Sequence, residues 1–248
     1  MFPAPIEKAS PAARTAYHAG VWVSLLLWLL PLGAMFLTSF RSLADISMGN
    51  FWGIPSEWMI IENYRGVFDT TPMGRFLLNS LMITVPTVVG ALAISSLAAY
   101  ALAKYNFKLN IALFAMFIGG NFIPFQILMI PVRNLTIDLG LYDTIIGLVL
   151  FHVAFQAGFC TLFLRNFIKA LPNSLIEAAR CDGAGELRIF FVLILPLIRP
   201  ALAALAVLIF TFVWNDYFWA LVLVQSDGVR PVTAGLEALK GQWLASWQ

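Results

Sequence analysis

Five long stretches with almost no charged side chains constrain the fold of this chain more than any other feature. The stretches cover residues 19–40, 76–103, 109–132, 144–164 and 200–226, and the one charge within them is Asp216 in the last. A helix needs about 20 apolar residues to cross the hydrocarbon core of a bilayer, which is about 30 Å thick. Only 11% of the residues are charged, against roughly a quarter in a soluble domain. The chain is therefore predicted to be an integral membrane protein with five spans.

The length of these stretches also separates the two kinds of membrane fold. A strand of a membrane barrel reads as about ten residues of alternating hydrophobicity, whereas these stretches are longer and uniformly apolar. The prediction is an all-α fold, a polytopic transmembrane helical bundle, with kinks at Pro31, Pro86 and Pro124. The first stretch exceeds the usual apolar core of a signal peptide. We expect a cytoplasmic tail over residues 1–18 and an uncleaved transmembrane domain over 19–248.

The positions of Lys and Arg predict the orientation of the spans. With the N-terminus in the cytoplasm, nine of the 15 basic residues lie inside and six outside, which is the bias expected of cytoplasmic loops. The connection 165–199 between the fourth and fifth spans is then cytoplasmic. Cys160 and Cys181 fall at or near this reducing side, where disulfides are rare, so both are predicted to be free thiols. Two cysteines and two histidines at these spacings give no zinc site.

The cytoplasmic connection 165–199 carries most of the organised polar sequence. Ser174 and Glu177 match a capping box, which predicts a short helix over 175–181. The helix is expected to stop at Gly183, which can adopt positive φ without a steric penalty. The connection therefore begins with a helix and a tight turn.

A second amphipathic stretch, 186–195, completes the connection. Pro196 and Pro200 follow it directly and are expected to break it, since proline lacks a backbone donor. The predicted order is helix, turn, helix.

Residues 177–196 carry a longer motif, which reads EAARCDGAGELRIFFVLILP. The spacing is EAA, three residues, Gly, nine residues, Leu, one residue, Leu-Pro. This resembles the EAA loop of ABC importer permeases. The following span contains WND at residues 214–216, and the combination is similar to the sugar-importer permeases of the maltose type, specifically their second permease. Leu193 and Cys181 depart conservatively from the usual pattern.

The resemblance implies a type I ABC importer permease fold and a coupling role for the loop. In that family the loop docks on a separate cytoplasmic ATPase. The implied coupling residues are Glu177, Ala178, Ala179, Asp182, Gly183, Leu195 and Pro196. The plainer interpretation is that Ser174 and Glu177 only cap a surface helix, which would contribute about 1 kcal/mol; capping and docking are compatible.

The resemblance also implies partners. These are a second permease in a heterodimer, an ATPase dimer that binds ATP and Mg²⁺, an external solute-binding protein and membrane lipid, but no nucleic acid. No cofactor is expected on this chain. The implied location is the inner membrane of a bacterium or archaeon. The family typically has a sixth span, so we expect one beyond Gln248, because residues 241–248 are uncharged and carry two tryptophans. The alternative is a protein with five spans.

Polar side chains within the apolar stretches are candidates for the substrate pathway. They are Asn121, Gln126, Trp214, Asn215 and Asp216. An ionisable residue inside a span suggests a pathway or a partner, although Asp216 lies about 24 Å along its stretch and could equally be interfacial. The amides could instead serve contacts between helices.

Other functions fit the sequence less well. No GxxxxGK[ST], HExxH or GxSxG motif occurs, so the chain is predicted to be neither an ATPase nor a hydrolase. An ion-coupled secondary transporter would need paired intramembrane charges and two similar halves, whereas Asp216 stands alone and His152 is expected to be a satisfied core histidine. Non-sugar cargoes such as glycerol phosphate remain open. The spans lack basic residues, which favours an uncharged cargo such as a sugar.

Overall fold

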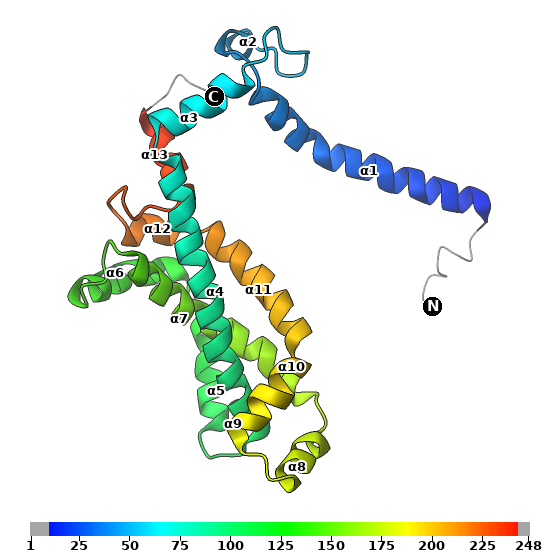
Figure 1. The fold of residues 1–248 in the computed structure, drawn as a ribbon, viewed down its shortest axis with the longest axis vertical. Helices are drawn as coiled ribbons and strands as arrows, with labels where there is room; N and C mark the ends of the chain where they lie inside the picture. Colours follow the sequence, from blue (N-terminus) through cyan, green and yellow to red (C-terminus); the bar gives the residue numbers. More distant parts are fainter. Residues whose placement is uncertain (1–9, 243–248) are drawn as a thin grey trace. The chain divides into compact units, whose positions relative to one another are not determined.

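The computed structural model describes residues 10–242, and within them every regular element is helical (Figure 1). Three helices are each long and apolar enough to cross a membrane: α1 (Pro11–Thr38), α4 (Met73–Lys104) and α7 (Ile145–Lys169). Two further helix pairs, each bent by more than 40°, pass the same test together, so that up to five spans are present. The prediction of an all-α polytopic fold is confirmed. Residues 1–9 of the predicted tail and the residues after 242 lie outside the described part.

The chain divides into two compact units, and the first described unit covers residues 10–71. Its helix α1 begins at Pro11, well before the predicted start at residue 19, because Ser10 accepts a hydrogen bond from the N–H of Ala13 at 3.3 Å. Such an N-cap stabilises a helix by roughly 1 kcal/mol. Residues 11–18, predicted as tail, are therefore helical.

The segment after α1 forms two helices, α2 (Leu43–Ser47) and α3 (Ile60–Thr70). Arg41 is fully buried and lies 3.8 Å from the carboxylate of Asp45. The backbone N–H and the hydroxyl of Ser56 each donate to that carboxylate at 2.7 Å. The N–H of Ser56 lowers the pKa of Asp45 below its usual range. Side-chain hydrogen bonds therefore give this segment a defined structure.

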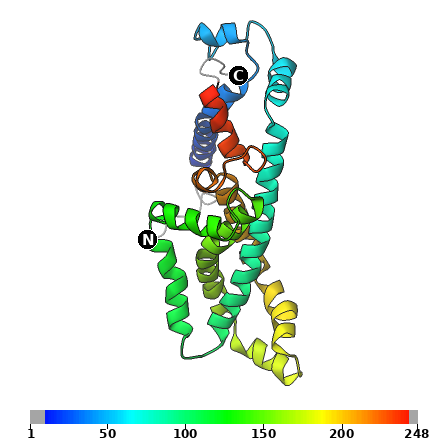
Figure 2. The same cartoon turned by 90° about the vertical axis from the view of Figure 1, so that its left-hand side faces the viewer.

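The second unit covers residues 72–242, and the helices α4 and α7 pack along each other at its centre (Figures 1 and 2). Ala91, Ser95 and Ala99 recur every fourth residue on the buried face of α4. Small residues at this spacing allow two helices to approach closely within a membrane. The hydroxyl of Ser95 donates to the carbonyl of Ala157 at 3.2 Å across this contact.

The third predicted span is not a single helix. It consists of α5 (Asn110–Gly119), η2 (Gly120–Phe122), η3 (Phe125–Leu128) and α6 (Met129–Asp138), and its halves meet at 94°. The cause is Pro124, which excludes Ile123 from the helical region and leaves it at ψ 122°. By contrast, α1 and α4 continue through Pro31 and Pro86 without a break.

The fifth predicted span is also divided. Its main helix is α11 (Arg199–Trp214), which is followed by a break and by α12 (Phe218–Leu223). The side chain of Asn215 donates to the carbonyl of Thr211 at 2.8 Å and covers the end of α11. Hydropathy cannot detect such a stop, so the prediction of one helix over 200–226 is wrong.

The approach to α11 differs from its prediction as well. It runs through α9 (Glu186–Arg188), a π-helical turn η4 (Ile189–Ile194) and α10 (Leu195–Leu197), and then bends by 73° into α11. Pro196 does not break the helix, because it lies in a helical run that continues from η4 into α10. Pro200 directly follows the bend and stands near the start of α11, where a missing N–H costs nothing. The predicted break is therefore present before Pro200 and absent at Pro196.

The last described helix, α13 (Val232–Gln242), is attached to α4 by side chains. Asn79 donates to the carbonyls of Gly228 and Arg230 at 3.0 Å. The hydroxyl of Ser80 accepts from the N–H of Val232 at 2.9 Å. The loop before α13 is thereby fixed against the N-terminal half of α4.

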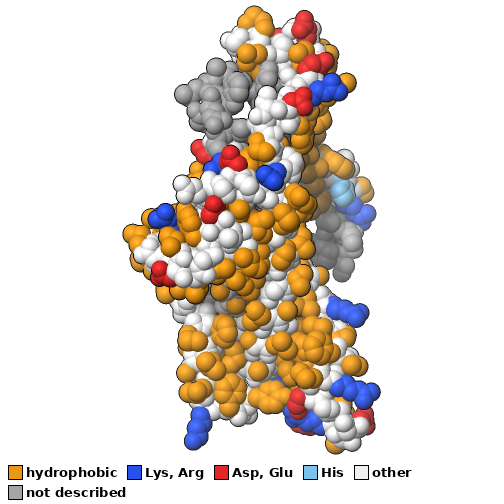
Figure 3. Space-filling model, turned by 60° about the vertical axis from the view of Figure 1, so that its left-hand side comes forward, with side chains coloured by type: hydrophobic (Ala, Val, Ile, Leu, Met, Phe, Trp, Pro, Cys, Tyr) orange, Lys and Arg blue, Asp and Glu red, His pale blue; other side chains and the backbone are white. Residues whose placement is uncertain are grey.

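The surface of the second unit agrees with a membrane location. In Figure 3 a band of hydrophobic side chains lies between charged side chains at the lower end, where α8 lies in Figure 1, and charged side chains over the upper half. Phe122, Ile111 and Val207 are 81%, 79% and 70% exposed. A soluble protein rarely exposes contiguous apolar surface of this extent.

Candidate functional site

The helix α8 (Asn173–Cys181) stands at the end of the second unit and holds the EAA residues. Its Ile176 is 3% exposed and belongs to the core, and Ala179 packs partly against that core. Glu177 and Ala178 are exposed. The helix is therefore fixed by one face and presents the opposite, small and acidic face outward.

The turn after α8 has the predicted conformation. Gly183 has a φ of 78°, and its N–H donates to the carbonyl of Arg180 at 3.0 Å. The N–H of Ala184 reaches back to the carbonyl of Ala179 at 3.0 Å. Asp182, between these residues, is exposed. This pattern ends the helix and reverses the chain.

The predicted capping box at the start of α8 is wrong. The helix begins at Asn173 after an extended Pro172, and no side chain caps it. Ser174 lies inside the first turn instead. The side chain of Asn173 accepts a hydrogen bond from Nζ of Lys104 at 2.8 Å, and the same ammonium donates to the carbonyl of Leu171 at 2.7 Å. A contact from α4 thus takes the place of the local cap.

Glu186, which the sequence did not single out, joins α8 to α4. Its Oε1 accepts from Nε of Arg180 at 2.8 Å. Its Oε2 accepts from the hydroxyl of Tyr100 at 3.0 Å and from that of Tyr105. The two tyrosines are distant in sequence, and only an observed contact could assign them. The remaining predicted coupling residues, Leu195 and Pro196, are half-buried in α10 behind this cluster.

The two broken spans meet at a second candidate region. Phe125, which begins η3, lies edge-on to Phe218, which begins α12, with ring centroids 5.1 Å apart. Asn121, Gln126 and Asn215 flank the two breaks and are all exposed. The structure therefore brings three of the predicted pathway residues to neighbouring elements.

Close packing positions the first of these amides. The side chain of Asn121 donates to the carbonyl of Phe117 at 2.9 Å. A Cβ at Gly158 of α7 would lie 2.5 Å from that carbonyl and 2.8 Å from the Asn121 nitrogen. Only glycine permits this approach of α5 to α7.

The aromatic residues near the second break have separate roles. Trp214 stacks on Phe210 with centroids 5.5 Å apart and is half-buried. Trp219 is 4% exposed and packs on Phe151 at 4.1 Å. Tyr217 remains 39% exposed. Among these rings, Trp219 is a core residue and unavailable for stacking on a cargo.

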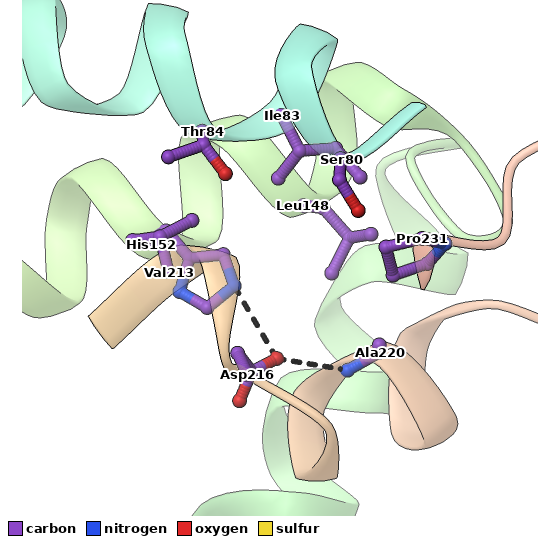
Figure 4. Close-up of a pocket in the computed structure, with 9 residues that line it drawn as sticks. All are labelled: Ser80, Ile83, Thr84, Leu148, His152, Val213, Asp216, Ala220 and Pro231. Carbon is purple, nitrogen blue, oxygen red and sulfur yellow. Dashed lines mark hydrogen bonds and ion pairs between the residues drawn. The ribbon is translucent and has the colours of Figure 1, made fainter. Parts of the chain in front are cut away.

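Asp216 does not stand alone, contrary to the expectation. Its carboxylate accepts from the N–H groups of Trp219 at 3.4 Å and Ala220 at 3.1 Å and so caps α12. The same carboxylate lies 3.5 Å from Nε2 of the buried His152 (Figure 4). His152 is 4% exposed and has a partner in Asp216, as expected of a satisfied core histidine.

A cavity of about 10 Å³ lies beside this pair; His152 and Asp216 line it together with Ser80 and Thr84 of α4 (Figure 4). The Thr84 hydroxyl is buried and has no protein partner within the described residues. A space of this size holds about one water molecule. His152 of α7 and Asp216 before α12 thus belong to a polar contact that also includes Ser80 and Thr84 of α4.

Comparison with known proteins identifies the family to which this sequence is similar. Residues 91–244 match the family model described as binding-protein-dependent transport system inner membrane component. The chain is 38% identical to an osmoprotective compounds uptake permease of Synechocystis, over 93% of this chain and 79% of that protein. It is 31% identical to the sn-glycerol-3-phosphate transport system permease of Pectobacterium atrosepticum, over 93% and 84%.

A solved structure shows the same fold. A bacterial ABC transporter involved in the import of the acidic polysaccharide alginate superimposes with a TM-score of 0.79 at 26% identity. The match covers 95% of this chain and 83% of that chain. The elements that carry both candidate regions lie within the matched length.

Proposed function

Because this chain belongs to the family of inner membrane components of binding-protein-dependent transport systems, we propose that it forms half of the translocation pathway for a sugar. We also propose that its helix α8 docks on a separate ATPase and transmits the conformational change that ATP hydrolysis drives. Membership makes it a multi-pass inner membrane permease subunit of an ABC importer, a transport protein rather than an enzyme. The cargo, the docking element and the orientation are the proposed parts.

The observation that carries the coupling role is the form of α8. Ile176 anchors the helix in the core, while Glu177, Ala178 and Asp182 are presented outward. Small side chains permit close approach by a partner, and the carboxylates can pair with basic groups in a cleft. The ATPase dimer would bind ATP and Mg²⁺, and this chain would bind no cofactor.

Basic residues near α8 support one orientation of the spans in the membrane. The basic residues of the second unit that lie near α8 include Lys104, Arg165, Lys169, Arg180 and Arg188. The excess of Lys and Arg in cytoplasmic loops supports α8 in the cytoplasm. The N-terminus of α1 would then be cytoplasmic too, with the segment 39–71 outside.

An uncharged carbohydrate fits the second candidate region best. Exposed amides at the two breaks, Asn121, Gln126 and Asn215, cannot be satisfied by lipid and suit a hydroxyl-rich cargo or a second permease. No basic side chain stands beside them in these stretches. Relatives and fold neighbours carry both neutral and anionic solutes, so glycerol phosphate is the alternative that the test must distinguish.

Co-purification and uptake test the proposal together. A tagged chain purified in mild detergent is expected to bring a second permease and an ATPase, both identified by mass spectrometry. Cells are then tested for uptake of labelled maltose, alginate trisaccharide and glycerol 3-phosphate. Recovery of the chain alone or as a homo-oligomer would reject the coupling role and favour a secondary transporter. Uptake of glycerol 3-phosphate alone would reject the sugar.

A matched pair of variants tests the pathway residues. Gln126→Leu removes an exposed amide at the first break, and Ile127→Leu changes the exposed neighbouring residue without changing polarity. Uptake is expected to fall in Gln126→Leu only, with equal amounts of assembled complex. Equal uptake by both variants would remove Gln126 from the pathway.

A further inference from the structure

At the C-terminal end of α8, the carboxylate of Glu186 connects this helix with the rest of the second unit. One oxygen, Oε2, accepts from Tyr100 at the end of α4 and from Tyr105 just beyond it. The other oxygen, Oε1, accepts from Arg180 on α8 at 2.8 Å. One side chain therefore bridges two elements, with each oxygen serving one of them.

The two halves of this bridge differ in strength. The side chains of Arg180 and Glu186 are 44% and 45% exposed, and an exposed ion pair by itself contributes little. Tyr100, in contrast, is 5% exposed and packs on Phe190 and Tyr105 with centroids 5.6 and 5.7 Å away. The hydrogen bond between a carboxylate and a buried hydroxyl, such as that of Tyr100, is among the stronger ones. Glu186 is thus fixed firmly to α4 and holds Arg180 in place.

The opposite end of α8 is fixed to the same place. Lys104, on the last turn of α4, donates to the carbonyl of Leu171 and to the side chain of Asn173. Both ends of α8 are therefore bonded to the final turn of α4 or the residue after it. Along the chain, Arg180 and Glu186 are joined by a turn that contains Gly183 and Gly185. These two glycines have wide backbone freedom, so the turn by itself is a flexible connection.

We propose that Glu186 is a positioning residue that makes α8 and the end of α4 move as one body, so that a displacement of α8 reaches the core helices. Without this bridge the glycine turn absorbs the displacement. The π-helical turn η4, which begins three residues later, then carries the second connection, to α11. Such turns often mark functional sites in helices. The inference rests on the proposed coupling to an ATPase.

The test uses the assembled transporter, with Glu186→Gln and Tyr105→Phe as variants. Asp138→Asn is the control, since it removes an exposed carboxylate on α6. Amide hydrogen exchange of residues 174–183 is followed by mass spectrometry. ATP hydrolysis is measured with and without the solute-binding protein. The binding protein is purified from cells and used with the cargo that remains bound to it.

Glu186→Gln is expected to assemble and to hydrolyse ATP without the binding protein. Exchange over 174–183 is expected to rise about tenfold, the effect of losing one hydrogen bond to a charged group, and stimulation by the binding protein is expected to be lost. Tyr105→Phe is expected to show a smaller change in the same direction and decides the matter if Glu186→Gln does not assemble. Asp138→Asn is expected to match the unchanged protein.

Two results would overturn the inference. One is wild-type exchange in both variants, which would mean that the bridge does not hold α8. The other is faster exchange with full stimulation, which would mean that the bridge holds α8 but carries no signal. Failure of the unchanged chain to assemble with an ATPase would instead reject the proposed function, and the exchange measurement on the permease alone would still test the bridge.

Discussion

Replacing Gly183 should weaken the coupling between the ATPase and the permease. The loss should grow with the strain that each new residue has at the φ angle of this position. Gly183 has a φ of 78°, and a Cβ built on it would meet no atom within 4 Å. Gly183→Ala therefore adds no clash and costs only the left-handed backbone penalty, about 1–2 kcal/mol. Such a cost lowers the population of the native turn about fivefold to thirtyfold relative to its alternatives.

Gly183→Asn and Gly183→Pro extend this prediction in opposite directions. Asparagine tolerates the left-handed region better than alanine does, so its effect should be smaller. Proline fixes φ near −65° and cannot make the hydrogen bond that the Gly183 N–H gives to the carbonyl of Arg180. A cost above about 3 kcal/mol follows. Stimulated ATP hydrolysis should therefore fall in the order Gly, Asn, Ala, Pro.

Gly185 provides a matched control for this series. It has a φ of −71° and open space at its Cβ position, so Gly185→Ala should leave coupling unchanged. The assay is ATP hydrolysis by the reconstituted transporter with its loaded binding protein, and co-purification of the ATPase shows that each variant is assembled. Equal effects of Gly183→Ala and Gly185→Ala, or normal stimulation in Gly183→Pro, would refute the reasoning.

Three further predictions concern single side chains. Asp216→Ala removes the cap of α12 and the partner of His152, so uptake should fall more than assembly; unchanged uptake across the sugar panel would return Asp216 to a purely structural role. Burial raises the pKa of Asp143, but two backbone N–H groups outweigh it and lower this pKa. The contribution of Asp143 to the stability of the fold is therefore complete above the unfolded pKa of about 4 and is lost as the pH falls below it. Hydrogen exchange over residues 224–227 should increase only under acid conditions. In Asp143→Asn this acid-dependent increase should be absent. Maleimide should modify one thiol per native chain, because Cys181 is exposed and Cys160 buried; modification of both would contradict the packing of α7.

Sequence reasoning succeeded where a long pattern determines the structure. Long apolar runs can only be helices in a bilayer, and they located four of the five regions that pass as spans; the fifth region, the bent pair 186–214, only overlaps the predicted span 200–226. The spacing of the EAA motif placed a helix end and a glycine turn correctly, because a residue at positive φ has few alternatives to glycine.

It failed where a contact between distant residues decides the local structure. Tyr100 and Glu186 lie 86 residues apart, and no local signal relates them. The start of α8 follows from a bond with Lys104 rather than from the capping box at Ser174. The break at Asp216 arises because its carboxylate caps a new helix, whereas hydropathy reads through it.

Cross-linking from Cys181 tests most directly whether α8 is the docking element. This exposed thiol ends α8 and can carry a photoreactive benzophenone without any substitution. Irradiation of membranes that contain the complete transporter should join this chain to the ATPase, and the peptide captured should lie in one surface cleft of that protein. Cross-links only to lipid or to a second copy of this chain, in membranes where the ATPase is present, would contradict the account.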